Sequence, residues 1–274
     1  MSSNNNKFSD YAFNQVKKID YLFYAIFKNS EFAEEIFTIY CFHLELSQIP
    51  VATDNPETRQ IRSKWWLETI QNLDKTKANQ THPIVSLIKI YFAKNREVLK
   101  AFEQLIIIRS KENELHGFKT NQKLFTYIEK TNLVIWELIY KIMFQCTLTK
   151  EKNQIISNFS KAIKLTNIAE SLYYRDYNNH FFVSDETISL HQNFNTLEKQ
   201  EAIFKYFCKE AEILFSEINI LFKKYKDLNS FSIYSKLNKS RLLLLMNCYK
   251  KNTVSTPPKI NKFLTNICIF FSKL

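Results

Sequence analysis

The chain has 274 residues, of which 45% are hydrophobic and 15% aromatic, and only one is glycine. Tight hairpins and phosphate-binding loops need residues that tolerate positive φ, so this composition excludes glycine-rich nucleotide-binding motifs and favours helices over sheets. The formal net charge of +11 is spread along the sequence without a zinc-finger spacing, RNP motif or recognition-helix pattern, so we do not expect nucleic-acid binding.

The first third of the chain predicts amphipathic helices, because apolar residues recur at intervals of three and four. A first helix is predicted over residues 9–28. A second should start with Ser30 as its N-cap and end before Pro50. A third begins at residues 55–56, where asparagine can cap the helix and proline suits its first position. A His-Pro pair at residues 82–83 opens a fourth.

Further helical patterns follow to the end of the chain. They cover residues 96–110, 121–143, 150–174, 196–226, 230–250 and 259–273. Residues 175–195 break this periodicity and are expected to form an irregular connection that contains a short helix. Because no linker rich in Pro, Gly or Ser divides the chain, we expect one all-α domain over residues 9–274, preceded by a disordered segment over residues 1–8.

The cysteines and the chain ends indicate the compartment. Five cysteines are widely separated and lie mostly among apolar residues, which is typical of reduced thiols in a protein core. The start of the chain lacks the apolar stretch of a signal peptide, and no apolar run reaches the roughly 18 residues that span a bilayer. We therefore expect a cytoplasmic protein. Residues 260–274 could form an apolar stripe for peripheral contact with the inner face of a membrane, or pack on the domain.

Three segments resemble motifs of the squalene/phytoene synthase family. Residues 40–49 (YCFHLELSQI) are similar to its first signature region, and residues 61–66 (IRSKWW) and 82–83 (HP) resemble motifs of a divergent branch. In enzymes of the family, the first signature helix carries two aspartates four residues apart, whose carboxylates can hold Mg²⁺ against a prenyl diphosphate. Ser47 and Val51 occupy those two positions here, and neither can bind Mg²⁺ as an anion.

A second signature is altered in the same way. Residues 164–168 (KLTNI) align with the start of Gln-Leu-Thr-Asn-Ile-Leu-Arg-Asp, which is followed by another aspartate four residues later. Asn167 keeps the asparagine of this signature, but Ser171 and Arg175 occupy the two aspartate positions and Glu170 replaces the arginine. The sequence offers no compensating carboxylate pair, because Glu45 lies about 200° around the helix from Ser47.

The branch that these motifs resemble includes the mitochondrial complex I assembly factor of the superfamily and its alphaproteobacterial relatives. The resemblance implies an all-α, isoprenoid-synthase-like helical bundle around a central apolar cavity. We interpret His43, Gln48 and Trp65 as candidates to line this cavity. The implied binding partners are a lipid or prenyl ligand in the cavity and a protein of a respiratory complex.

Loss of both aspartate motifs predicts a noncatalytic binding or respiratory-complex assembly protein, with no catalytic residue, metal or cofactor. The alternative is a divergent prenyltransferase that condenses prenyl diphosphates in isoprenoid biosynthesis and uses Mg²⁺. Diphosphate release from a prenyl diphosphate in the presence of Mg²⁺ separates the two hypotheses.

Overall fold

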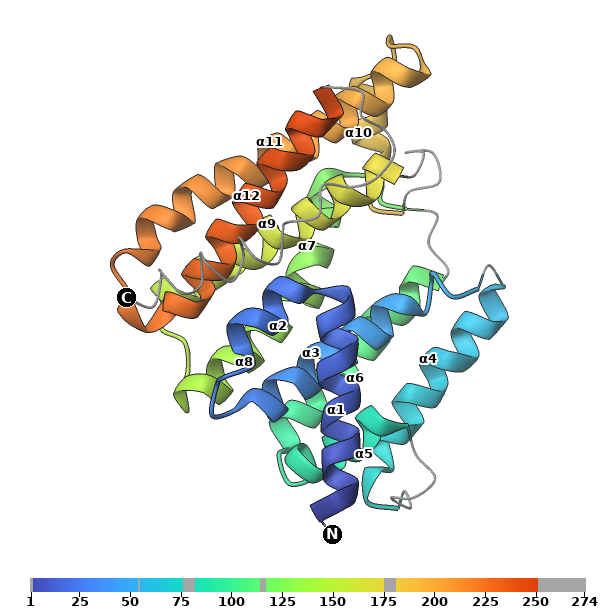
Figure 1. Ribbon diagram of the computed structural model, residues 1–274. Helices are drawn as coiled ribbons and strands as arrows, with labels where there is room; N and C mark the ends of the chain where they lie inside the picture. Colours follow the sequence, from blue (N-terminus) through green and yellow to red (C-terminus); the bar gives the residue numbers. More distant parts are fainter. Residues whose placement is uncertain (1, 54, 76–81, 114–116, 175–180, 251–274) are drawn as a thin grey trace. The chain divides into compact units, whose positions relative to one another are not determined.

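The described part of the chain comprises residues 2–53, 55–75, 82–113, 117–174 and 181–250 of a computed structural model, and it contains helices and no strand (Figure 1). This confirms the predicted all-α fold class. By their contacts, the residues divide into two compact units. Unit 1 comprises residues 1–115 and 134–148, and unit 2 comprises residues 116–133 and 149–274.

Unit 1 contains seven described α-helices and two short 3₁₀ turns. The α-helices are α1 (Ser2–Ile19), α2 (Tyr21–Phe27), α3 (Ala33–Gln48), α4 (Pro56–Gln71), α5 (Pro83–Phe92), α6 (Arg96–Ser110) and α8 (Val134–Phe144), and the turns are η1 (Leu73–Lys75) and η3 (Lys111–Asn113). Helix α1 packs against α3 and α5, α4 packs against α6, and α3 packs against α8.

Aromatic rings fill much of the core of unit 1. Phe23 of α2 stacks on Tyr40 of α3 with ring centroids 3.7 Å apart, and the Trp136 ring of α8 lies 5.8 Å from that of Phe23. Phe42, also on α3, lies 4.4 Å from Phe102 of α6. Because aromatic side chains bury large apolar areas, these contacts hold α3 between its neighbours.

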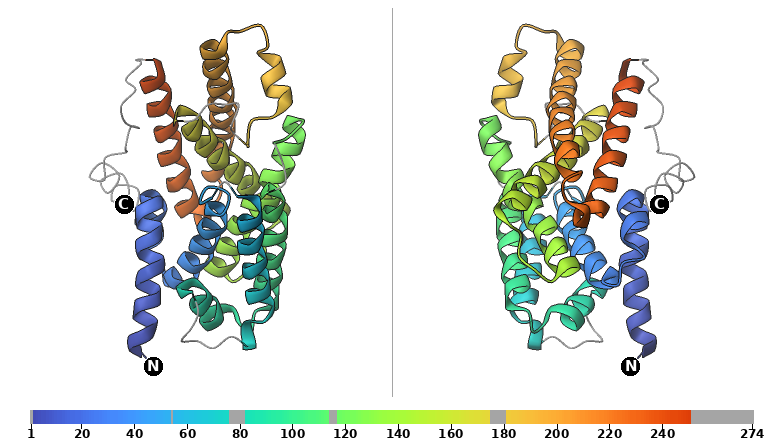
Figure 2. Two further views of the ribbon diagram at one scale, coloured as in Figure 1. Left: turned by 90° about the vertical axis from the view of Figure 1, so that its right-hand side faces the viewer. Right: turned by 90° about the vertical axis from the view of Figure 1, so that its left-hand side faces the viewer.

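Unit 2 is organised around three long helices. Its described elements are α7 (Asn121–Ile128), the π-helical turn η4 (Glu129–Leu133), α9 (Lys150–Tyr174), α10 (Asp185–Leu190), α11 (Thr196–Phe222), the 3₁₀ turn η6 (Lys226–Leu228) and α12 (Asn229–Lys250). Helices α9, α11 and α12 lie side by side, as Figures 1 and 2 show. The buried Phe159 ring of α9 contacts Phe222, Phe231 and Tyr234.

Several predicted helices have the bounds that the sequence indicated. Helices α6 and α9 cover the predicted residues 96–110 and 150–174, and α3 ends before Pro50. At α4, the Asn55 side chain accepts hydrogen bonds from the backbone N–H groups of Glu57 and Thr58, and Pro56 is the first helical residue. The short helix expected within residues 175–195 is α10.

The predicted helix over residues 9–28 is wrong, because Asp20 interrupts it. Its carboxylate accepts a hydrogen bond from the Phe23 N–H at 2.9 Å and thereby caps a separate helix, α2. At the other end, α1 already starts at Ser2, within the segment that we expected to be disordered.

Two other expected boundaries also differ. Helix α3 begins at Ala33 without a side-chain cap, so Ser30 is not its N-cap. The Ser30 hydroxyl instead accepts a hydrogen bond from the Phe32 N–H in a local turn. The helix expected over residues 121–143 is divided into α7, η4 and α8. Within this stretch, the buried Thr131 hydroxyl donates to the Tyr127 carbonyl, a contact that bends helices.

The cysteine and membrane predictions are tested only in the described part of the chain. Cys41 and Cys208 are buried free thiols, as expected, whereas Cys146 is a free thiol on the surface. None of the described helices combines the length and apolarity needed to cross a bilayer. The predicted helix over residues 259–273 lies outside the described residues.

Candidate functional site

The first-signature positions hold no metal ligands of the expected kind. Ser47 lies at the end of α3, and its hydroxyl donates a hydrogen bond to the Leu44 carbonyl at 2.7 Å. Val51 lies in the turn beyond α3 and is 53% exposed, and its N–H donates a hydrogen bond to the Gln48 carbonyl. Because α3 ends before Pro50, the two positions do not lie on successive turns of one continuous helix.

Two residues of the second signature, Asn167 and Glu170, contact the same cation within unit 2. Asn167, Glu170 and Ser171 lie on α9. The guanidinium of Arg241 on α12 donates to the Asn167 amide oxygen at 3.4 Å and forms an ion pair with Glu170. Glu170, the acidic residue next to Ser171, is therefore neutralised by a side chain of the same unit. Arg175 lies outside the described residues.

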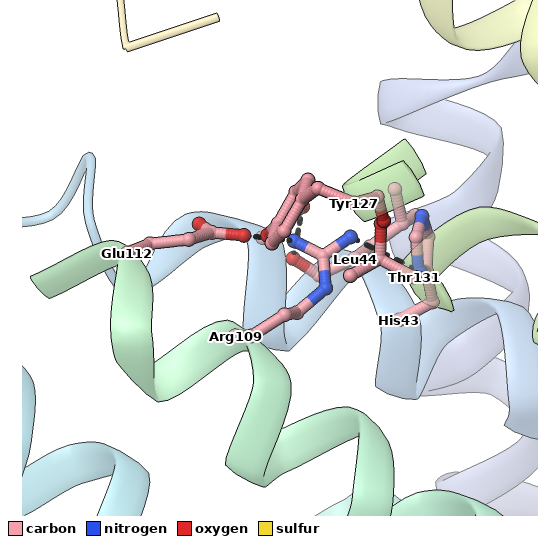
Figure 3. A network of polar contacts seen from close by, with 7 residues as sticks. His43, Leu44, Arg109, Glu112, Tyr127 and Thr131 are labelled. Atoms are coloured by element: carbon pink, nitrogen blue, oxygen red, sulfur yellow. Dashed lines mark hydrogen bonds and ion pairs between the residues drawn. The ribbon is translucent and has the colours of Figure 1, made fainter. Parts of the chain in front are cut away.

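His43 takes part in a buried polar network of unit 1. The Arg109 guanidinium contacts the Glu112 carboxylate and the His43 ring (Figure 3). It lies 3.4 Å from a Glu112 carboxylate oxygen and 3.3 Å from His43 Nδ1. An arginine has no acceptor atom, so His43 Nδ1 accepts this hydrogen bond and the imidazole carries its proton on Nε2. Burial lowers the pKa of Arg109, and the Glu112 carboxylate opposes that shift. We interpret this network as a structural feature of the core of unit 1.

A pocket of about 350 Å³ opens elsewhere in unit 1, between α3, α4 and the start of α5. We call it the Glu45 pocket. Its lining combines a carboxylate, an amide, a guanidinium and an imidazole with two indole rings and two isoleucines. The lining residues are Glu45, Gln48, Ile49, Ile61, Arg62, Trp65, Trp66 and His82. Its volume falls at the small end of the range of ligand sites.

Glu45 is held in the Glu45 pocket by two groups from other elements. Its Oε1 accepts a hydrogen bond from the Tyr11 hydroxyl of α1 at 2.8 Å and lies 3.7 Å from His82 Nε2. Burial and the neighbouring Glu45 carboxylate raise the pKa of Tyr11, so the phenol stays protonated as a donor. The hydrogen bond from Tyr11 fixes the orientation of the Glu45 carboxylate, and 26% of the Glu45 side chain is exposed.

His82 is fixed by its role as the N-cap of α5. Its Nδ1 accepts the Ile84 N–H at 3.3 Å, so in the neutral imidazole the proton is on Nε2, the nitrogen nearer Glu45. Burial lowers the pKa of His82, and the Glu45 carboxylate partly opposes this. A neutral His82 leaves Glu45 and Arg62 as the charged groups of the lining.

The aromatic part of the wall is also ordered by packing. The buried Trp66 ring makes edge-to-face contacts with Phe42 at 5.2 Å and with His82 at 5.5 Å. Trp65 lies edge-on to Trp66 at 4.9 Å and is 44% exposed. One indole therefore packs into the core of unit 1 and the other presents its ring at the surface.

The structure brings together two of the three predicted cavity residues. Gln48 and Trp65 line the Glu45 pocket, whereas His43 lies beside Arg109. Whether they border the central cavity that the resemblance implies stays a prediction. Sequence reasoning did not single out Glu45 or His82 as site residues, although three of the four motif segments of the resemblance, residues 40–49, 61–66 and 82–83, contribute to this pocket. The occurrence of these motif segments in one sequence was the signal that could have pointed to Glu45 and His82.

Within the described residues, no group of three His, Cys, Asp or Glu side chains is arranged to hold a metal ion.

Comparisons with known proteins identify the family. The family model described as squalene/phytoene synthase matches residues 16–215. The chain is similar in structure to a dehydrosqualene synthase solved in complex with ligand (TM-score 0.77, 15% identity, 98% of this chain and 96% of that chain). It is also similar to the squalene synthase HpnC from Alicyclobacillus acidocaldarius (TM-score 0.66, 14% identity, 92% and 96%). A search of curated proteins gives no match.

At these identities the solved structures establish the shared fold, whereas the family model spans well over half of the sequence. The chain belongs to the squalene/phytoene synthase family.

Proposed function

We propose that this protein is a noncatalytic member of the squalene/phytoene synthase family that acts as a binding or respiratory-complex assembly protein. The observation that carries the proposal is the chemistry at the signature positions. By the motif resemblance, Ser47, Val51, Ser171 and Arg175 occupy the positions at which the family has aspartates. The acid nearest the second signature, Glu170, is paired with Arg241.

The chemistry of prenyl transfer explains why these replacements matter. Ionisation of an allylic diphosphate places negative charge on the leaving group, which metal ions and basic residues must stabilise. Mg²⁺ is held through carboxylates and phosphate oxygens. A serine hydroxyl bonded to its own helix, such as that of Ser47, adds no negative charge for the metal. Glu170 is paired with Arg241, so its carboxylate is not free to bind a metal ion.

The proposed partners follow from the resemblance to the complex I assembly branch. We propose a lipid or prenyl ligand in an apolar cavity and a protein of a respiratory complex as the partner, without a resident cofactor. Peripheral membrane contact is assigned to residues 260–274, which lie outside the described residues. Flotation with liposomes of the full chain and of a chain ending at residue 259 tests this contact, which equal partitioning of the two would rule out.

The catalytic alternative is tested by incubating the purified chain with farnesyl or geranylgeranyl diphosphate and Mg²⁺. A dehydrosqualene synthase assayed in parallel serves as the positive control. We expect no diphosphate release above the enzyme-free background, whether or not the prenyl diphosphate binds. Release that requires Mg²⁺, stops with a chelator and is lost in Asn167→Ala would establish the divergent transferase instead.

A further inference from the structure

The Glu45 pocket contains charges of both signs that are not paired with each other. Glu45 and Arg62 line the same cavity, yet no ion pair joins them within the described residues. We propose that the Glu45 pocket binds a small zwitterion, in which an organic ammonium group is linked by a short spacer to an acid group. The proposal holds whether or not prenyl transfer is lost, because the described residues at the former aspartate positions, Ser47, Val51 and Ser171, do not line this pocket.

Glu45 supplies the contact for the ammonium group. Tyr11 and His82 both approach its Oε1, and among the described residues no hydrogen bond reaches Oε2. A partly buried carboxylate oxygen without a donor is stabilised when a cation enters the pocket. Because Oε1 already accepts a hydrogen bond from the Tyr11 hydroxyl, the carboxylate loses little conformational freedom on binding.

The two indole rings favour an alkylated ammonium over a small inorganic cation. Trp65 and Trp66 line the Glu45 pocket together with Ile49 and Ile61. Indole faces attract cations electrostatically, and alkyl groups on the nitrogen gain from contact with the apolar wall. Packing against Phe42 and His82 fixes the Trp66 ring, so this part of the wall is preformed.

Arg62 distinguishes a zwitterion from a simple cation. Its guanidinium carries five donors and has no hydrogen bond or ion pair with the described residues, and the Gln48 amide lines the same pocket. A ligand with only a positive charge would meet the repulsion of Arg62 and of a chain with a net charge of +11. An acid group on the same ligand turns this repulsion into a charge-assisted contact.

The volume of about 350 Å³ suits a ligand of the size of an amino acid or of a phosphocholine group. These two sources share the chemistry that the pocket recognises, an ammonium group and an acid group a few atoms apart. The first would be a free metabolite and the second the headgroup of a lipid.

The test is calorimetric titration of the full chain with phosphocholine, and separately with choline and methyl phosphate, which each carry one of its charged groups. We expect phosphocholine to bind about tenfold or more tightly than either fragment, since each charge-assisted contact contributes on the order of 1.4 kcal/mol. The proposal is overturned if choline binds as tightly as phosphocholine, or if phosphocholine does not bind at up to about 10 mM.

Charge-neutral variants assign the two contacts. Glu45→Gln should weaken the binding of both choline and phosphocholine, whereas Arg62→Gln should weaken only that of phosphocholine and methyl phosphate. Lys64→Gln and Glu68→Gln are matched controls, because both residues are exposed on α4 and lie outside the pocket lining. If Glu45→Gln does not fold, the comparison of Arg62→Gln with Lys64→Gln still decides, and equal affinities of those two variants would refute the proposal.

Two further measurements distinguish a free metabolite from a lipid headgroup. Leucine in the same titration represents the free amino acid, and phosphatidylcholine vesicles represent the lipid headgroup. Vesicle binding that Arg62→Gln weakens and Lys64→Gln does not would assign a lipid headgroup. Binding of leucine and phosphocholine without vesicle binding would assign a free zwitterion. Because this experiment contains neither Mg²⁺ nor a prenyl diphosphate, its failure leaves the proposed loss of catalysis untouched.

Discussion

Single polar side chains decide where several helices of unit 1 begin. Asp20 caps α2 and also accepts a hydrogen bond from the Tyr40 hydroxyl at 2.7 Å, which ties the helix start to α3. His82 caps α5 and at the same time approaches Glu45. The spacing of apolar residues shows which face of a helix is apolar. It does not show which polar side chain ends one helix and caps the next. The break at Asp20 was therefore missed.

His82 makes the stability of the chain depend on pH. Burial lowers its folded-state pKa, so the unfolded chain binds a proton at a higher pH than the folded chain does. The stability that neutral His82 contributes is present above its unfolded pKa of about 6.5 and is lost as the pH falls through the folded-state value. Asn at this position removes the titration but can still accept the Ile84 N–H.

We therefore expect the free energy of unfolding to fall more for the wild-type chain than for His82→Asn between about pH 7 and pH 5. Urea denaturation followed by circular dichroism at several pH values measures both. Carboxylates titrate in both chains and cancel in the difference. Parallel pH profiles, or a steeper fall in the variant, would contradict a depressed His82 pKa.

At the scale of elements, side-chain caps fix where individual helices begin. Helix α11 starts at Thr196, as expected, because Asn195 and Glu198 form a capping box. The Asn195 side chain accepts the Glu198 N–H at 3.0 Å, and the Glu198 carboxylate accepts the Asn195 N–H at 3.2 Å. Helix α11 then packs along α9, so the cap stabilises a central element of unit 2.

Asn195→Ala should lower the free energy of unfolding by about 1 kcal/mol, because it leaves the Glu198 N–H without its side-chain acceptor. Thermal and urea denaturation would measure the loss. Asn195→Asp retains an acceptor oxygen at the same position and should be close to wild type. A loss of equal size in both variants would mean that something other than the cap is responsible.

At the scale of the whole molecule, neither unit is a continuous stretch of sequence. Helix α8 belongs to unit 1, although residues 116–133 before it belong to unit 2. Its Trp136 ring packs near Phe23 and Tyr40 in the core of unit 1. The absence of a polar linker predicts one domain, and the interleaved segments give a physical reason why no linker interrupts the sequence.

This arrangement predicts that a chain ending at residue 115 does not fold cooperatively. Without α8, the Phe23 and Tyr40 rings lose a large apolar partner, which costs several kcal/mol for one buried aromatic residue. A chain ending at residue 148 retains α8 and serves as the control. Circular dichroism during heating should show a sigmoidal transition only for the longer chain, and a sharp transition in both would contradict the prediction.

The sequence by itself determined the all-α class, the family and most helix bounds, because periodicity, proline and asparagine caps act within a few residues. It also marked the segments around Glu45, Trp65 and His82 as one motif set. Only the tertiary structure placed these segments around one pocket and paired Glu170 with Arg241. Helix packing brings together side chains far apart in sequence, and no local pattern encodes which of them meet.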